Sequence, residues 1–267
     1  MAEEPRPFLK WAGSKRQLMH ALLPRVPDKY GTFFEPFVGA GALFFALGPQ
    51  RAVLADTNAR LVRTYQGIRD DVKGVIALLQ SYPHDKAFFY RMRDVDIDAR
   101  SDAEVAAWFI YLNKTGYNGL YRVNRANRFN VPFGRHHNPT ICDAPNLRAC
   151  AAALADTEIR VADFEHAVRG AARGDFVYFD PPYVPLSATS SFTSYTSGGF
   201  GPADQVRLRD LALKLKRKRV SVLLSNSSAK AVRELYESNF KVEEVPATRR
   251  VNSDATKRGA IAEFIIS

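Results

Sequence analysis

The sequence predicts an α/β fold in which an open, doubly wound sheet is interrupted by an inserted helical and loop module. First, strand-like apolar runs alternate with helix-like segments near both ends of the chain. Second, this alternation stops between residues 58 and 146, where amphipathic helices lead into a loop rich in Gly, Asn, Arg and Pro. Third, 267 residues with 46% hydrophobic content suit one large domain that carries an insertion. We therefore expect one domain formed by residues 1–57 and 147–267, and a second formed by residues 58–146.

The first elements of the sheet are expected in the N-terminal quarter of the chain. Thr32–Pro36 has the composition of a strand and leads through a glycine-bearing turn into a helix at Ala42–Leu47. The apolar run Ala52–Ala55 predicts a second strand, which ends on Asp56. Apolar residues then recur at helical spacing over Asn58–Ile68.

The inserted module is expected to begin with helices and to end in a loop. Consecutive amphipathic helices are predicted between Asp71 and Thr115, and an irregular loop is predicted at Gly116–Asn146. Strands and helices then alternate again. The expected strands are Glu158–Val161, Asp175–Phe179, Val220–Leu224, Phe240–Val245 and Ile261–Ile266, and the expected helices are Pro202–Leu215 and Ala229–Glu237. The last two strands are expected to pair antiparallel at the edge of the sheet.

Three aspartates stand at the ends of expected strands: Asp56, Asp163 and Asp180. Because ligands of open α/β sheets bind at the carboxyl ends of the strands, these acids predict a shared site. Asp56 also follows the glycine-bearing turn Phe37–Gly41, and a strand-terminal carboxylate after such a turn can accept the ribose hydroxyls of a nucleoside cofactor. The alternative for Asp56 is a capping role for the helix that follows it.

The tetrapeptide Asp180-Pro181-Pro182-Tyr183 follows a strongly β run and carries the clearest chemistry. Proline provides no N–H for a sheet ladder, so the strand ends here in a stiff turn. The Asp180 carboxylate and the Pro181 carbonyl can accept both N–H bonds of an aromatic amine and free its delocalised lone pair. Tyr183 can stack on the ring. The alternative is an ordinary Asp-Pro turn beside a core tyrosine.

The charge of the chain favours a polyanionic partner. Lys and Arg outnumber Asp and Glu by 38 to 28, which gives a formal net charge of +10, and a strongly basic balance is typical of nucleic-acid binding, although some basic proteins have no such partner. Lys114–Arg135 contains five basic residues and no acidic one, with four aromatic residues between them. This combination suits phosphate contacts together with stacking at an unpaired base, and the alternative is a solvated loop with a few core aromatics.

Other classes of protein are disfavoured. The two cysteines are too few for a disulfide framework, and no cysteine or histidine pattern has metal-ligand spacing, so we expect no metal site. The N-terminus lacks the apolar stretch of a signal peptide, and no run approaches the roughly 18 apolar residues of a membrane span. We therefore expect a cytoplasmic protein that does not bind membranes.

Five motifs follow one another along the chain. They are Phe8–Lys15 (FLKWAGSK), Phe34–Gly41 (FEPFVGAG), Asn118–Arg122 (NGLYR), Phe129–Gly134 (FNVPFG), and Asp180–Tyr183 (DPPY) with Pro185-Leu186-Ser187 after it. In this order they resemble the Dam-type (alpha group, D12 class) DNA adenine-N6 methyltransferases over nearly the whole chain. The resemblance implies a Rossmann-like S-adenosylmethionine methyltransferase sheet with an inserted helical and loop DNA target-recognition domain.

The resemblance also implies roles for individual residues. Catalysis would involve Asp180, Pro181 and Tyr183. S-adenosyl-L-methionine would be bound by Trp11, Lys15, Phe37, Gly39, Gly41, Asp56, Asp163, Phe164 and Asp180. Duplex DNA would be bound by Lys10, Tyr117, Asn118, Leu120, Arg122, Asn130, Pro132 and Arg135. One position departs from the pattern, because His136 stands where relatives commonly have tyrosine.

The reaction that the resemblance implies is direct methyl transfer to a flipped-out adenine, with GATC as the target sequence. Two settings stay open: the protein acts beside a restriction endonuclease that cuts the same site, or it is an orphan regulatory enzyme without such a partner. The alternatives that remain are a cytosine-N4 or RNA adenine methyltransferase, and a non-catalytic DNA-binding regulator. A nucleotide-dependent oxidoreductase is disfavoured because the glycine turn lacks the third glycine of the dinucleotide fingerprint.

Overall fold

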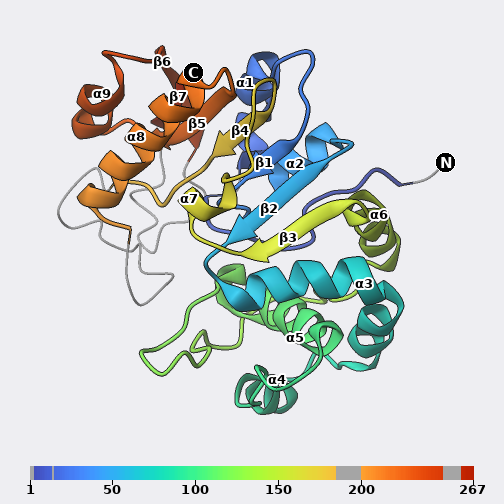
Figure 1. Cartoon of the computed structure of the whole chain (residues 1–267). Coiled ribbons are helices and arrows are strands. Elements are labelled where there is room, and N and C mark those ends of the chain that lie inside the picture. The colour runs from blue at the N-terminus through green and yellow to red at the C-terminus, as the bar shows by residue number, and fades with distance from the viewer. Residues whose placement is uncertain (1–2, 14, 185–199, 249–259) are drawn as a thin grey trace. The chain divides into compact units, whose positions relative to one another are not determined.

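The computed structural model describes residues 3–13, 15–184, 200–248 and 260–267, and within them strands and helices alternate except over the consecutive helices between residues 59 and 154 (Figure 1). The chain divides into two compact units. Unit 1 comprises residues 1–14, 39–48 and 56–161, and unit 2 comprises residues 15–38, 49–55 and 162–267. These bounds group the chain by its internal contacts, whereas the functional division into a domain at 1–57 and 147–267 and a domain at 58–146 stays a prediction.

Unit 2 is built on a mixed sheet (Figure 1). Its strands are β1 (Phe33–Glu35), β2 (Ala52–Asp56, the last residue of which is grouped with unit 1), β4 (Phe176–Phe179), β5 (Ser221–Ser227), β6 (Val242–Thr248) and β7 (Ala260–Ile266). They lie in the order β2-β1-β4-β5-β7-β6. β1 pairs parallel with β2 and β4, and β4 pairs parallel with β5. β7 is antiparallel to both β5 and β6, which confirms the antiparallel pair expected at the sheet edge.

The central strands of unit 2 are buried along their whole length, as both faces of a parallel sheet require. All three residues of β1 and all four residues of β4 are buried. Helices η1 (Lys15–Leu18), α1 (Met19–Leu22), η2 (Leu23–Arg25), α7 (Phe164–Ala167), α8 (Pro202–Arg217) and α9 (Lys230–Tyr236) complete the unit. α8 and α9 contribute Leu208, Leu215 and Tyr236 to a core shared with Val177 and Phe179 of β4.

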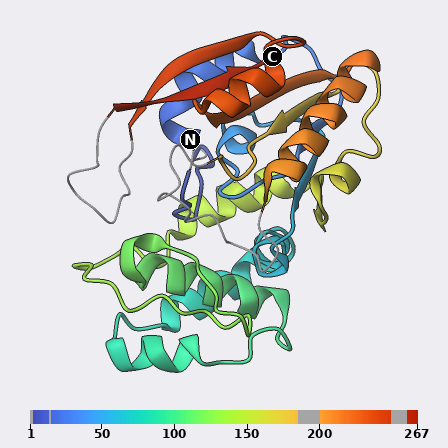
Figure 2. The same ribbon diagram turned by 90° about the vertical axis from the view of Figure 1, so that its left-hand side faces the viewer.

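Unit 1 is mainly helical (Figure 2). Its elements are α2 (Ala42–Leu47), α3 (Ala59–Ser81), α4 (Lys86–Arg93), α5 (Asp102–Thr115), η3 (Tyr117–Gly119), α6 (Ala144–Leu154) and β3 (Thr157–Val161). α5 packs along α3, and α4 also packs against α5. α5 begins with a capping box between Ser101 and Glu104, and its residues from Val105 to Asn113 are all buried.

Two features of unit 1 differ from the expectation. α3 continues past Ile68 to Ser81, with one non-helical residue at Asp71, and so joins two segments that were expected to be separate. The loop expected at Gly116–Asn146 is wrong over its last three residues, because α6 begins at Ala144. The Asp143 side chain accepts from the Asn146 backbone N–H, and the proline that follows suits a first helical turn.

The other predicted elements are present, with small shifts at their ends. α2 has the bounds that its sequence predicts. The strands expected at Glu158–Val161, Asp175–Phe179 and Val220–Leu224 all form, as β3, β4 and β5. β5 is longer than expected, since it runs on through Ser225 and Asn226 to Ser227. None of the helices in the described part of the chain has the length and apolar character that a membrane span requires.

Candidate active site

The predicted cofactor residues of unit 1 meet at the glycine turn that precedes α2. Gly39 and Gly41 adopt left-handed backbone conformations, with φ of +47° and +63°. A Cβ built on Gly39 would lie 2.8 Å from Cδ1 of Trp11, so the indole packs directly against the glycine backbone. These two glycines are therefore required by both conformation and space, which is the arrangement that lets a ligand approach the backbone closely.

Tyr65 of α3 packs against this turn and donates a hydrogen bond to it. Its hydroxyl donates to the carbonyl of Gly39 at 3.0 Å, and a Cβ on Gly41 would lie 2.9 Å from the same oxygen. Tyr65 is fully buried and also contacts Phe8 and Phe45. The sequence marks Tyr65 only as an apolar position of a helix, so its role at the turn could not be predicted.

Asp56 ends β2 beside the same turn. Its Oδ1 accepts from the Asn58 N–H at 2.9 Å, and its Oδ2 lies 3.5 Å from the Gly39 nitrogen. The cap of α3 is Asn58, whose side chain accepts from the Leu61 N–H, so Asp56 is not the capping residue. Burial raises the pKa of Asp56 to about 6, and the backbone N–H groups oppose that rise. A half-buried carboxylate with an acceptor oxygen at the turn suits hydroxyl donors of a ligand.

Trp11 is held by an aromatic stack of unit 1. Its ring lies 6.3 Å from that of Phe109 and 6.1 Å from that of Tyr121, in nearly parallel planes. Tyr121 in turn stacks on Phe109 at 4.6 Å. We call Trp11, Gly39, Gly41, Asp56 and Tyr65 the glycine-turn cluster.

Asp180 is the centre of the predicted site residues in unit 2. It follows β4 directly, and its Oδ1 lies 2.9 Å from Nζ of Lys15 and accepts from Oγ of Ser225, also at 2.9 Å. Burial raises the pKa of Asp180, whereas the charge of Lys15 and the hydrogen bonds of Lys15 and Ser225 oppose that rise. The half-buried carboxylate is thus compensated by Lys15 and Ser225, since an ion pair shielded from water needs such added hydrogen bonds.

Tyr183 completes the turn after β4. Its hydroxyl donates to Oε2 of Glu263 on β7, and Nζ of Lys15 lies 4.5 Å from the centre of its ring. The carbonyl of Pro182 accepts from Nε2 of Gln205 at 3.2 Å. No described residue donates to the carbonyl of Pro181, which is the acceptor that the sequence assigns to an amine. We call Lys15, Tyr178, Asp180, Tyr183, Ser225 and Glu263 the carboxylate cluster.

The other predicted cofactor residues of unit 2 lie near α7. Phe37 stacks on Phe164 with ring centres 5.7 Å apart. Asp163 is the N-cap of α7, where its Oδ1 accepts from the His166 N–H at 2.8 Å and contacts Nδ1 of that ring at 2.7 Å. A capping role therefore accounts for the Asp163 carboxylate, and its predicted contact with the cofactor stays a prediction.

The predicted DNA-binding loop of unit 1 folds back on itself as two antiparallel segments joined by backbone hydrogen bonds. We call residues 116–136, which include both segments, the strip. Isolated bridges join Gly116 to Phe133 and Val123 to Phe129. Tyr117 is 49% exposed. Tyr121 and Phe129 are buried against Phe109 and Trp108, so the core alternative holds for these two rings.

Arg122 and Asn130 are fixed on this strip, and the backbone of Lys10 is tied to it through Asn113. The Nε of Arg122 donates to Oδ1 of Asn130 at 2.7 Å. Asn113 of α5 accepts from the backbone N–H of Lys10 and donates to the carbonyls of Lys10 and Gly119, each at 2.8 Å. Asn113 is buried. It was not predicted as a site residue, because its partners Lys10 and Gly119 lie within the sequence motifs but Asn113 itself does not.

The remaining predicted DNA-binding residues lie on the same strip. The carbonyl of Pro132 accepts from the Tyr117 N–H, and Pro132, Arg135 and Asn118 are exposed while Leu120 is half-buried. Asn118 has a left-handed φ of +54°. His136, the departure from the family pattern, contacts the carbonyl of Gly116 through Nε2 at 3.1 Å, so its ring is held against the strip.

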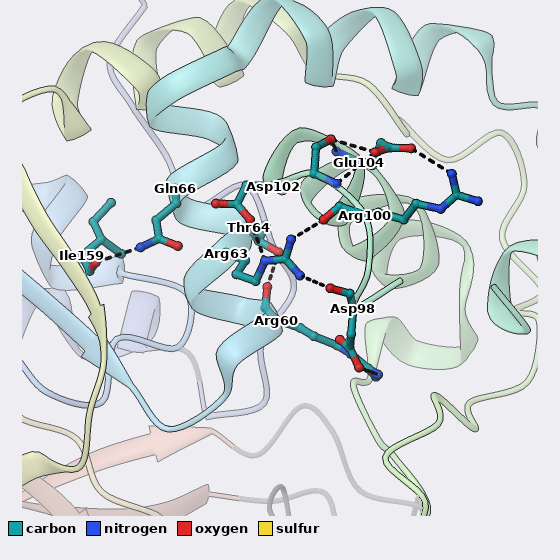
Figure 3. Close-up of polar contacts among 10 residues, drawn as sticks. Arg60, Arg63, Thr64, Gln66, Asp98, Arg100, Asp102, Glu104 and Ile159 are labelled. Atoms are coloured by element: carbon teal, nitrogen blue, oxygen red, sulfur yellow. Dashed lines mark hydrogen bonds and ion pairs between the residues drawn. The ribbon is translucent and has the colours of Figure 1, made fainter. Parts of the chain in front are cut away.

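Two arginines of α3, Arg60 and Arg63, form ion pairs with aspartates near the start of α5 (Figure 3). Arg60 is buried and makes a bidentate ion pair with Asp98, with both bonds at 2.7 Å. Its remaining nitrogen donates to the carbonyl of Asn127 at 2.7 Å, and its guanidinium lies over Trp108. Next to it, Arg63 pairs with Asp102, which joins the start of α5 to α3.

Two parts of the predicted motifs, Ser14 and Pro185-Leu186-Ser187, lie outside the described residues. Among the residues that are described, no group of three or more His, Cys, Asp or Glu side chains could hold a metal ion. Each unit therefore presents its own part of the predicted site: a glycine turn beside a carboxylate and a loop with exposed basic residues in unit 1, and a carboxylate beside an aromatic ring in unit 2.

Comparison with known proteins agrees with this chemistry. Residues 11–251 match the family described as D12 class N6 adenine-specific DNA methyltransferase. A Type II methyltransferase of Lactococcus lactis subsp. cremoris is 46% identical, over 98% of this chain and 95% of that protein. A Type II methyltransferase of Methanocaldococcus jannaschii is 39% identical, over 98% and 99%. A DNA adenine methylase of Haemophilus influenzae is 34% identical, over 97% and 92%.

Proposed function

Because the chain belongs to the D12 class of N6 adenine-specific DNA methyltransferases, we propose that it transfers a methyl group from S-adenosylmethionine to N6 of adenine in duplex DNA. The observation that carries the proposal is the Asp180–Tyr183 turn, where a half-buried carboxylate is followed by a proline carbonyl and an aromatic ring. The matching family is described as specific for N6 of adenine, so we do not propose a cytosine-N4 product.

The glycine-turn cluster fits S-adenosylmethionine. Gly39 and Gly41 leave no space for a side chain, and Asp56 offers a half-buried carboxylate to hydroxyl groups. Trp11 provides an apolar wall. Lys15, Phe37, Asp163, Phe164 and Asp180 are proposed to complete cofactor binding. When bound, the cofactor supplies an electrophilic methyl group attached to a positively charged sulfur.

The carboxylate cluster is proposed to prepare the amine. Asp180 accepts one N–H of the adenine amine and the Pro181 carbonyl accepts the other, which withdraws the lone pair from conjugation with the ring. Tyr183 stacks on the base, and its own hydroxyl is already engaged with Glu263, so the ring orientation is set before the base arrives. Held in this way, the adenine amine would present its lone pair to the methyl group that S-adenosylmethionine supplies when it is bound.

The exposed residues of unit 1 are proposed to bind DNA. The adenine leaves the duplex to reach the turn, since its amine is inaccessible in line within the base stack. Tyr117 would fill the space that it leaves, and Lys10, Asn118, Arg122 and Asn130 would contact bases or the backbone. Leu120, Pro132 and Arg135 complete the proposed DNA-binding set. We propose GATC as the target, on the resemblance to Dam-type enzymes, and residues 58–146 as the target-recognition domain.

The setting of the reaction is also proposed. A cytoplasmic location agrees with a DNA substrate. Two relatives are named Type II methyltransferases, which supports a restriction endonuclease of the same target as a partner.

The test is methylation of a plasmid by the purified protein. Transfer of tritiated methyl groups is measured for the wild type and for Asp180→Asn, and the methylated base and its sequence context are identified by digestion and sequencing. Asp210→Asn, which changes an exposed carboxylate of α8, is the matched control. We expect methyl-adenine at GATC in the wild type and the control, and a loss of about 10- to 150-fold in Asp180→Asn, since it removes one hydrogen bond to a charged group. Wild-type activity in Asp180→Asn would refute the assignment of this turn.

A further inference from the structure

The contacts of Asp180 are divided unequally between its two carboxylate oxygens. Nζ of Lys15 and Oγ of Ser225 both lie 2.9 Å from Oδ1. No described residue donates a hydrogen bond to Oδ2. An ionised carboxylate has about four acceptor positions on its two oxygens. The described donors occupy positions on Oδ1, so the acceptor positions of Oδ2 remain for a ligand.

The direction of each hydrogen bond follows from the number of protons. Ser225 has one hydroxyl proton, and it is donated to Asp180. The bond of 2.9 Å between Ser225 and the hydroxyl of Tyr178 must therefore have Tyr178 as its donor. Burial raises the pKa of Tyr178 well above its usual value, so the phenol keeps the proton that this direction needs. The chain thus runs from Tyr178 through Ser225 to Oδ1 of Asp180.

The strand register explains why these three side chains meet. Phe179 of β4 pairs with Leu224 of β5, so Asp180 and Ser225 are the next residues along two parallel strands. Tyr178 precedes Asp180 by two positions, and residues two apart in a strand share one face. All of these residues belong to unit 2, and Tyr178 and Ser225 are buried.

We propose that Ser225, with Tyr178 behind it, is a positioning residue for the methylation: it holds Oδ1 of Asp180 so that Oδ2 is the oxygen that accepts the amine N–H of adenine. This inference rests on the function proposed above. Ser225 does not touch the amine itself. It fixes the rotation of the carboxylate, which otherwise would turn about its Cβ–Cγ bond to follow Lys15 alone.

The variants that test this role are Ser225→Ala, Ser225→Thr and Tyr178→Phe. Ser225→Ala removes the donor, Ser225→Thr keeps a hydroxyl, and Tyr178→Phe keeps the ring but removes the outer hydrogen bond. Ser221→Ala, an exposed serine at the start of the same strand, is the matched control. Thermal melting shows which variants fold, and S-adenosylmethionine affinity is measured by calorimetry.

Single-turnover methylation of a short duplex gives the expected result. Ser225→Ala should lose about 10- to 100-fold in rate, because a hydrogen bond to a charged group is lost. Tyr178→Phe should lose about 3- to 10-fold, since the bond it removes joins neutral groups. Ser225→Thr should recover most of the rate, Ser221→Ala should match the wild type, and KM for DNA should change little throughout.

The pH profile separates positioning from a general loss of structure. Among the described residues, the ionisable groups around Asp180 and its hydrogen-bond chain are Lys15, Glu35, Tyr178, Tyr183 and Glu263. Only the carboxylate of Asp180 loses a donor in Ser225→Ala. That hydrogen bond lowers the pKa of Asp180, so its removal raises the pKa and moves the acid limb of the rate to higher pH.

Three results have distinct meanings. A folded Ser225→Ala variant with the rate and pH profile of the wild type would overturn the inference. A variant with unchanged single-turnover rate but weaker S-adenosylmethionine binding would also overturn it, because Ser225 would then orient Asp180 toward the cofactor. A wild-type protein that methylates no adenine would instead refute the proposed function. If Ser225→Thr does not fold, Tyr178→Phe still decides between these outcomes.

Discussion

Gly39→Ala is the sharpest probe of the glycine-turn cluster, because a matched glycine shares its backbone conformation but not its surroundings. Gly39 and Gly48 have φ of +47° and +53°. A Cβ on Gly39 would lie 2.8 Å from Cδ1 and 2.9 Å from Nε1 of Trp11, whereas a Cβ on Gly48 would meet nothing within 4 Å. The pair therefore separates the cost of a left-handed alanine from the cost of displacing the indole.

The magnitudes follow from these two contributions. A left-handed conformation costs an alanine roughly 1–2 kcal/mol, and both variants bear this cost. Overpacking against Trp11 adds about 1–3 kcal/mol in Gly39→Ala alone. For a chain of this size that difference lowers the melting temperature by roughly 2–12 °C more than in Gly48→Ala. The displaced indole should also weaken S-adenosylmethionine binding by about tenfold, which equals about 1.4 kcal/mol.

Calorimetric melting and titration with S-adenosylmethionine measure the two effects on the same preparations. Gly48→Ala should bind the cofactor like the wild type. Equal melting temperatures for the two variants would mean that Trp11 does not pack on Gly39. Unequal melting temperatures with equal, wild-type affinities would mean that the turn is structural and that the cofactor binds elsewhere.

Two further predictions concern the pH dependence of cofactor binding and the reading of DNA. Burial raises the pKa of Asp56 to about 6, so the carboxylate is ionised above that pH and protonated below it. Since the ionised form accepts ribose hydroxyls, affinity for S-adenosylmethionine should be about tenfold weaker at pH 5 than at pH 7, and calorimetry of Asp56→Asn should show no such slope. Arg122→Ala should relax discrimination at one base pair by about 1–3 kcal/mol in competition with single-base variants of the target. Arg128→Ala is its control: it should keep discrimination and lower only the salt dependence, and loss of discrimination in both would exclude Arg122 as a base reader.

Much of the fold could be predicted because its elements are strongly patterned. The bounds of α2 and the final antiparallel pair follow from local composition, since a buried strand and an amphipathic helix have different periods. The start of α6 was missed because a polar loop and a capped helix share their first residues, here Asp143 and the proline after it. The continuous α3 was missed because its irregular residue, Asp71, has the polarity of a break between two helices.

The candidate site divides in the same way. Motif residues such as Gly39, Asp56 and Asp180 could be found because their chemistry is local to a turn. Tyr65 and Asn113, which hold these motifs or their neighbours, could not be found, because their partners lie 26 and 103 positions away. A sequence gives the identity of a supporting residue but not its distance from the group that it supports.

Ser225 and Asn226 show how such support is concealed. In sequence they resemble the polar end of a strand, so β5 was expected to stop before them. In the structure the strand continues through both, and both are buried. Buried polar side chains need partners, and these find Asp180 and Gln205, at 2.9 and 3.0 Å. Gln205 in turn donates to the carbonyl of Pro182, so both residues of β5 act on the Asp180–Tyr183 turn. Polar residues at the carboxyl end of a buried parallel strand therefore need not mark the end of that strand. They are better interpreted as hydrogen-bond partners of the neighbouring turn.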